Sequence, residues 1–150
     1  MASKKTLVAF ISGHTNLRDA EFETHYRDAL DKAIAEGHDF VIGTSVGGDR
    51  MGFDYLLKHG VAPLKITIYI YDKYKANLEP QYQKMGVKTK GGYTSYNQRD
   101  GQMTKDSDYD ILWVRSEEEN RKIYEDDYRA GRISGTEQNR IRRQKLAKKA

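Results

Sequence analysis

Short apolar runs that favour strands alternate along the chain with stretches that favour helices. The strand-like runs cover residues 6–13, 39–45, 64–72, 86–91 and 109–115. The helix-like stretches cover residues 18–37, 49–60, 76–84 and 95–107, and a last helix starts near Thr136. Because parallel strands need crossover connections, usually helices, this order predicts an α/β fold. We expect a single Rossmann-like domain, doubly wound around a mainly parallel sheet of about five strands.

The individual segments differ in how strongly they predict their structure. Residues 64–72 alternate Ile66, Ile68 and Ile70 with polar or aromatic positions, the pattern of a strand. Residues 18–37 place their apolar side chains at helical intervals and end at Gly37, which predicts one long helix. Residues 116–133 are charged and poorly periodic, so we interpret them as an insertion before a basic C-terminal helix.

Length and composition limit the function. A chain of 150 residues fits one domain spanning residues 1–150, and the absence of cysteine excludes disulfides and thiolate metal sites. No apolar run approaches the roughly 18 residues of a membrane span, so a cytoplasmic protein without a membrane partner is expected. The net charge of +4 is concentrated in the last eleven residues, six of which are basic. Binding to single-stranded nucleic acid through this tail is one alternative, and a solvated helix face is the other.

The ends of the first two strands carry the residue types of an anion site. Ligands of doubly wound sheets bind at the carboxyl ends of the strands. After the first strand we select Ser12, Gly13 and His14, and after the second Gly43, Gly47, Gly48 and Asp49. Glycines ahead of a helix let the backbone approach a phosphate, although a tight turn with positive φ angles explains them equally well. The spacing matches neither a Walker loop nor the dinucleotide fingerprint.

Later segments are expected to complete the same crevice. Arg99 and Asp100 precede Met103, which should point into the core, and the pair is a candidate for catalysis or a surface ion pair. Residues Ser134, Gly135, Thr136 and Asn139 open the last helix, as caps, as phosphate ligands or as both. Tyr93 and Tyr96 are candidates for stacking on a base. The histidines lack metal-ligand spacing, so we expect neither a metal nor another cofactor.

These motifs resemble the SLOG superfamily, the Rossmann-like group that includes the LONELY GUY-type phosphoribohydrolases. Arg99 and Met103 keep that family's interval, Asp108 precedes an apolar strand, and Gly135-Thr136 match its Gly-Thr step. The stretch GTSVGGDRMGFD is similar to the first phosphate loop of the smaller members. The resemblance implies a nucleotide ligand, a homodimer, and a charge-stabilising role for Arg99.

The chain departs from the family pattern at two points. Asn139 stands where the family has a catalytic glutamate, and GRIS replaces the family's Pro-Gly-Gly. Hydrolysis of the N-glycosidic bond of a nucleoside 5′-monophosphate would then need another carboxylate, for which Asp100 is the best placed. The alternative is a non-catalytic sensor or sponge for a nucleotide-derived signal.

Overall fold

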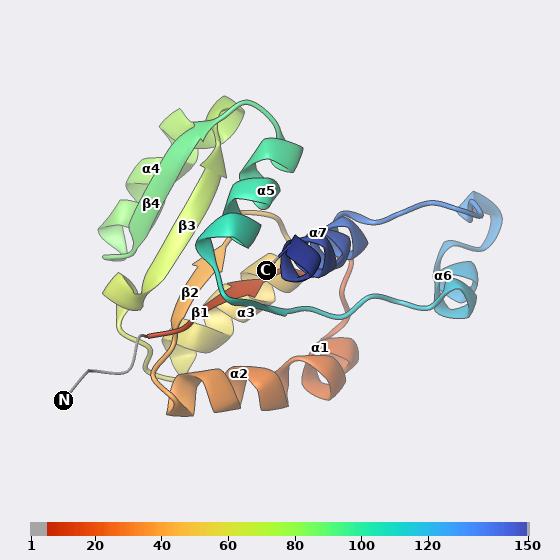
Figure 1. Cartoon of the computed structure of the whole chain (residues 1–150), viewed down its shortest axis with the longest axis horizontal. Coiled ribbons are helices and arrows are strands. Elements are labelled where there is room, and N and C mark those ends of the chain that lie inside the picture. Colours follow the sequence, from red (N-terminus) through yellow and green to blue (C-terminus); the bar gives the residue numbers. More distant parts are fainter. Residues whose placement is uncertain (1–5, 150) are drawn as a thin grey trace.

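Five parallel strands form the centre of the molecule in the computed structural model, which describes residues 6–149. The strands are β1 (Val8–Ile11), β2 (Asp39–Ile42), β3 (Ile66–Tyr71), β4 (Lys88–Tyr93) and β5 (Tyr109–Ile111). Their order in the sheet is β4-β3-β2-β1-β5, and Figure 1 labels the first four of these strands. All four neighbouring pairs are parallel. The predicted single α/β domain with a five-stranded sheet is therefore confirmed, and strand order reverses at β1.

Helices cover both faces of this sheet. One layer contains α1 (Asp19–His25), α2 (Arg27–Ala35), α3 (Gly48–Lys58) and α4 (Lys75–Lys84). The other contains α5 (Tyr96–Asp106) and α7 (Gly135–Lys149), which pack against each other. Single 3₁₀ turns lie at η1 (Pro63–Lys65), η2 (Asp72–Tyr74) and η3 (Glu125–Asp127).

Alternation along the strands divides the core between the two layers. Ile11, Ile42 and Ile68 are fully buried in the larger cluster, which contains side chains of the α1–α4 layer. Phe10 and Val41, on the opposite face, belong to a smaller cluster with Met103 of α5. Met103 therefore points into the core as expected, which fixes α5 so that its first turn lies beside the ends of β1 and β2.

The stretch expected to form one long helix forms two, because the chain breaks between α1 and α2 at Tyr26. The Tyr26 side chain is fully buried, and its hydroxyl donates to the Ser12 carbonyl oxygen at 2.7 Å. The same hydroxyl accepts from the Trp113 backbone N–H at 3.2 Å. Tyr26 thus ties the loop after β1 to the segment after β5.

The last strand is shorter than residues 109–115 because the chain leaves the sheet after Ile111. The backbone N–H of Trp113 is bonded to Tyr26, and that of Arg115 donates to Nε2 of His14 at 3.1 Å. The Tyr26 and His14 side chains therefore accept from the N–H groups of Trp113 and Arg115, which a longer strand would bond to its neighbour in the sheet.

The insertion contains a helix of its own, α6 (Glu117–Tyr124). Ser116 caps it by accepting from the Glu119 N–H at 3.1 Å, and glutamates fill its first turn. Both features stabilise a helix N-terminus. Figure 1 shows α6 standing away from the body, joined to it by two extended connections.

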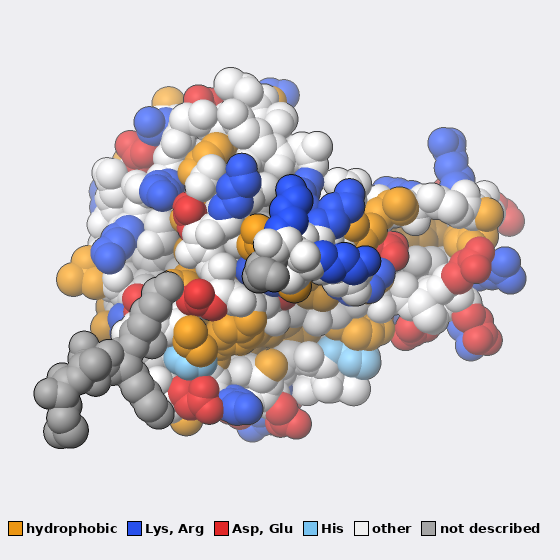
Figure 2. All heavy atoms as spheres, viewed as in Figure 1, with side chains coloured by type: hydrophobic (Ala, Val, Ile, Leu, Met, Phe, Trp, Pro, Cys, Tyr) orange, Lys and Arg blue, Asp and Glu red, His pale blue; other side chains and the backbone are white. Residues whose placement is uncertain are grey.

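Lysine and arginine gather over α7, as Figure 2 shows. Several of these residues are already engaged: Arg143 pairs with Asp110 at 3.0 Å, and Arg142 donates to the Asn139 side chain at 2.6 Å. The lysines nearer the end of α7 are exposed. Among residues 6–149, no helix is long and apolar enough to cross a membrane.

Candidate functional site

A pocket of about 590 Å³ opens at the carboxyl ends of β1 and β2, between α5 and α7. We call it the central pocket. It brings together most of the residues selected from the sequence: Ser12, Gly13, His14, Asp49, Tyr96, Arg99, Asp100, Ser134, Gly135, Thr136 and Asn139 all line it. Gly43, Gly47, Gly48 and Tyr93 do not line it. Thr44, Tyr74 and Leu78 line it as well and were not selected.

Arg99 lies at the inner end of the pocket and is almost fully buried. The N-cap Ser95 accepts from the Gln98 N–H at 3.0 Å, which fixes the start of α5 one turn before Arg99. The guanidinium donates to Asp100 through Nε and Nη2, both at 3.0 Å, and to Thr44 Oγ1 at 3.4 Å. The guanidinium carbon lies 4.8 Å from the centre of the Tyr96 ring, in cation–π geometry. Arg99 is therefore held rigidly.

Asp49 is a second carboxyl group of this pocket. Burial raises the pKa of Asp49 from 3.8 to about 7, and the nearby Asp100 acts in the same direction, whereas Arg99 opposes both. Its Oδ2 accepts from the Ser45 backbone N–H at 3.3 Å. The pocket therefore holds one carboxyl that keeps its proton up to about neutral pH beside another that is paired with arginine.

Asn139 connects α7 to Asp100. Its side-chain nitrogen lies 3.5 Å from Oδ2 of Asp100, and its side-chain oxygen accepts from Arg142. Arg142 also bonds the Asn97 side chain of α5. Asp100 is thus contacted by Arg99 on one oxygen and by Asn139 on the other.

Ser12 contributes a buried hydroxyl to the central pocket. Its side chain is buried and lines the central pocket, and its Oγ is the one buried side-chain polar atom in residues 6–149 that makes no hydrogen bond. Buried polar groups are rarely left without a partner, because the loss of hydration costs free energy.

The first turn of α7 forms one side of the pocket. Ser134 caps the helix by accepting from the Glu137 N–H at 3.1 Å, while its carbonyl accepts from Gln138. Within the described chain, the N–H groups of Gly135 and Thr136 make no hydrogen bond to another residue. N–H groups of this kind at a helix N-terminus favour anions.

The glycines after β2 serve close backbone packing. A Cβ on Gly48 would lie 2.5 Å from the Gly13 Cα, and one on Gly47, whose φ is +77°, would lie 2.3 Å from the His14 carbonyl oxygen. The Gly48 N–H already donates to that carbonyl at 3.0 Å. Gly43 lies against Arg99 and Asp49, where a Cβ would be within 2.8 Å of either side chain. These glycines bring the two loops together behind the pocket.

Aromatic residues form the outer wall of the central pocket. Tyr96 and Tyr74 line it together with Leu78, and the Tyr96 ring stacks on Tyr71 at 4.9 Å between ring centres. Tyr93, the other candidate for base stacking, stacks instead on Tyr69 in the smaller core cluster. The structure therefore places only one of the two selected tyrosines at the pocket.

Sequence reasoning missed Arg115, which positions His14. Arg115 is buried, bonds both oxygens of Glu21 at 3.0 and 2.7 Å, and donates to the Asn16 side chain at 2.6 Å. Burial, reinforced by the Arg115 charge, lowers the pKa of His14 to about 4. His14 is therefore neutral at pH 7. An arginine ending an apolar run is the sequence signal that could have indicated this ion pair.

The described residues contain no group of three or more histidine or acidic side chains that could hold a metal ion. No family model, curated protein or solved structure matches the chain. The resemblance to the SLOG superfamily stays a prediction.

Proposed function

We propose that the protein binds a nucleoside 5′-monophosphate or a closely related nucleotide in the central pocket. The observation that carries this proposal is the Ser12 hydroxyl, which is buried at the pocket wall and makes no hydrogen bond within residues 6–149. The oxygen has almost no accessible surface in the unliganded protein, so a small rotation of the side chain would let a ligand oxygen or nitrogen complete its hydrogen bonding and recover the free energy lost on burial.

The size and lining of the pocket suit a nucleotide. A volume of about 590 Å³ lies within the range of pockets for small molecules. Tyr74, Leu78 and Tyr96 offer an apolar wall for a base. Gly135 and Thr136, which also line the pocket, offer N–H donors for a phosphate, supported by the dipole of α7.

Because two carboxyl groups, Asp49 and Asp100, line the pocket, we propose that it cleaves the N-glycosidic bond of the nucleotide. Bond breaking develops positive charge on the ribose and requires a proton for the departing base. Asp100, paired with Arg99, would stabilise that positive charge or orient the attacking water. Asp49 keeps its proton to about pH 7 and would be the proton source, so the two groups fill different roles in one pocket.

A specific observation favours the alternative of a binding protein without turnover. Both oxygens of Asp100 already have partners, Arg99 and Asn139, and these contacts restrain its approach to a substrate. In this alternative the pocket would sense or sequester the nucleotide.

Incubation with each common ribo- and deoxyribonucleoside 5′-monophosphate, followed by chromatography for free base, distinguishes the two functions. For an enzyme, Asp100→Asn should lower turnover by roughly 100- to 10,000-fold while nucleotide binding persists. Asp54→Asn, an exposed carboxylate on α3, is the matched control and should leave turnover unchanged. Thermal stabilisation of the wild type by a nucleotide without release of base would indicate the sensor. If no nucleotide is cleaved and none raises the melting temperature, the proposal is wrong.

A further inference from the structure

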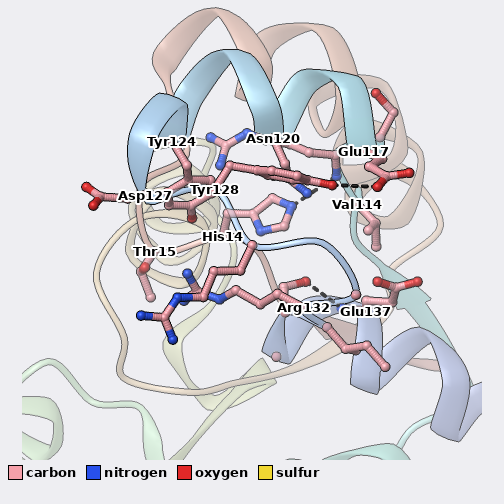
Figure 3. Close-up of a pocket in the computed structure, with 17 residues that line it drawn as sticks. His14, Thr15, Val114, Glu117, Asn120, Tyr124, Asp127, Tyr128, Arg132 and Glu137 are labelled. Carbon is pink, nitrogen blue, oxygen red and sulfur yellow. Dashed lines mark hydrogen bonds between the residues drawn. The ribbon is translucent and has the colours of Figure 1, made fainter.

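A second, larger cavity lies beside the central pocket, under the inserted helix. We call it the outer pocket. It has a volume of about 880 Å³ and lies between the segment after β5, α6, η3 and the chain leading into α7. Figure 3 shows His14 in the middle of this cavity, with Tyr128 and Asn120 on the α6 side. The insertion thus supplies much of the wall of a cavity.

The two pockets meet along a common wall. His14 and Thr15 from the loop after β1, and Ser134 and Gly135 from the start of α7, line both cavities. The wall therefore includes Gly135, whose N–H makes no hydrogen bond within residues 6–149. Ser12, whose buried hydroxyl has no partner in the same residues, lines the central pocket with it. A phosphate bound at this wall would face both cavities.

The outer pocket offers groups that bind an aromatic ring and negative charge. Tyr124 and Tyr128 are half-buried, and the Arg132 guanidinium lies 5.4 Å from the Tyr124 ring centre. Neither Arg129 nor Arg132 pairs with a carboxylate in the described part of the chain, although both line the cavity. Tyrosine rings stack on bases, and unpaired arginines bind phosphates.

We propose that the ligand of this protein is a dinucleotide, two nucleosides joined by a 5′–5′ pyrophosphate, and that it occupies both pockets. One nucleoside lies in the central pocket, the pyrophosphate lies at the common wall, and the second base stacks on Tyr124 or Tyr128. Two phosphate groups would lie against Arg129, Arg132 and the N-terminus of α7. Three carboxylates also line the outer pocket: Glu117 pairs with Arg121 and Glu137 with Arg140, which leaves Asp127 without an arginine partner among residues 6–149. This inference rests on the proposed nucleotide binding at the central pocket.

Isothermal titration calorimetry tests the inference with matched pairs of probes. Each common ribonucleoside 5′-monophosphate is compared with the symmetric dinucleoside pyrophosphate of the same base. The dinucleotide should bind about tenfold more tightly, the scale of one additional base–aromatic stack. Tyr128→Ala and Arg132→Ala should each remove most of that advantage and leave the affinity for the monophosphate unchanged. Lys122→Ala, on the exposed face of α6, is the control and should change neither affinity.

The outcomes separate the two proposals. If a monophosphate binds and its dinucleotide binds no more tightly, the bipartite ligand is excluded while the central site stands. If the dinucleotide is preferred but the preference survives in both outer-pocket variants, the outer pocket does not bind the second nucleoside and the inference is overturned. If neither kind of probe binds, the proposed nucleotide site in the central pocket is wrong. Circular dichroism of the Tyr128→Ala and Arg132→Ala variants verifies that each is folded.

Discussion

Replacing Asp49 with asparagine should change how the stability of the protein depends on pH. The folded protein raises the pKa of Asp49 from 3.8 to about 7, mainly through burial, with Asp100 adding and Arg99 opposing. Between these two values the folded state holds a proton that the unfolded state releases. The free energy of unfolding therefore falls as pH rises through this window, by roughly 4 kcal/mol in total.

The pKa of His14 changes the pH dependence of stability in the opposite direction. Its pKa falls from 6.5 to about 4, mainly through burial, so between these values the unfolded state holds the extra proton. The contribution of His14 to stability is lost as pH falls through that window, and amounts to roughly 3 kcal/mol. The two contributions largely offset each other in the wild type. Asp49→Asn removes one of them, so the variant should gain stability steeply as pH rises.

Urea denaturation of wild type and variant measures this effect. From about pH 4 to about pH 8, the stability of Asp49→Asn should rise relative to wild type by roughly 4 kcal/mol. Asparagine has the same shape and can still accept from the Ser45 N–H, so the fold should persist. Asp54→Asn, exposed on the same helix, should show no such change. A constant difference between Asp49→Asn and wild type across this range would refute the argument that Asp49 is buried with its proton.

Two further predictions concern the packing behind the site. Gly48→Ala should lower the free energy of unfolding by about 1–3 kcal/mol, because its Cβ would lie 2.5 Å from backbone atoms. Gly135→Ala, with nothing within 4 Å of its Cβ, should lower it far less. Thermal melts of both variants measure the two losses, and equal losses would contradict the packing argument. Arg115→Met should lower the free energy of unfolding by about 3–5 kcal/mol, since it leaves Glu21 without its partner in a part-buried site. Arg121→Met, which breaks an exposed ion pair, should lower it by about 1 kcal/mol or less. Equal shifts of the two urea midpoints would show that the Arg115 ion pair does not stabilise the fold.

The sequence predicted the fold well because each strand carries its own signal. The isoleucines at 66, 68 and 70 and the glycine stops after the helices are local features, and the order of elements then implies a parallel sheet. What the sequence could not predict depends on contacts between distant residues. Tyr26 separates α1 from α2, and its hydroxyl bonds Ser12 and Trp113, which are 14 and 87 residues away.

In the candidate site, too, local features could be predicted from the sequence and contacts between distant residues could not. Arg99, Asp100 and Ser134 could be placed at the crevice because they follow strand ends or open a helix. The role of Gly48 could not be foreseen, since its contact with Gly13 joins two loops far apart in the chain. The outer pocket could not be predicted because residues 116–133 show no period, and only the folded chain places residues of α6 around the same cavity as His14.

Calorimetric titration of wild type and Ser12→Ala with the common nucleoside 5′-monophosphates tests the central claim most directly. Ser12→Ala removes the buried hydroxyl that has no partner in residues 6–149, so the unliganded variant should be as stable as wild type or slightly more stable. If a nucleotide supplies that partner, the wild type should bind it and the variant should bind about tenfold more weakly. Wild type that binds none of these nucleotides, or a variant with undiminished affinity, would contradict the assignment of the central pocket as a nucleotide site.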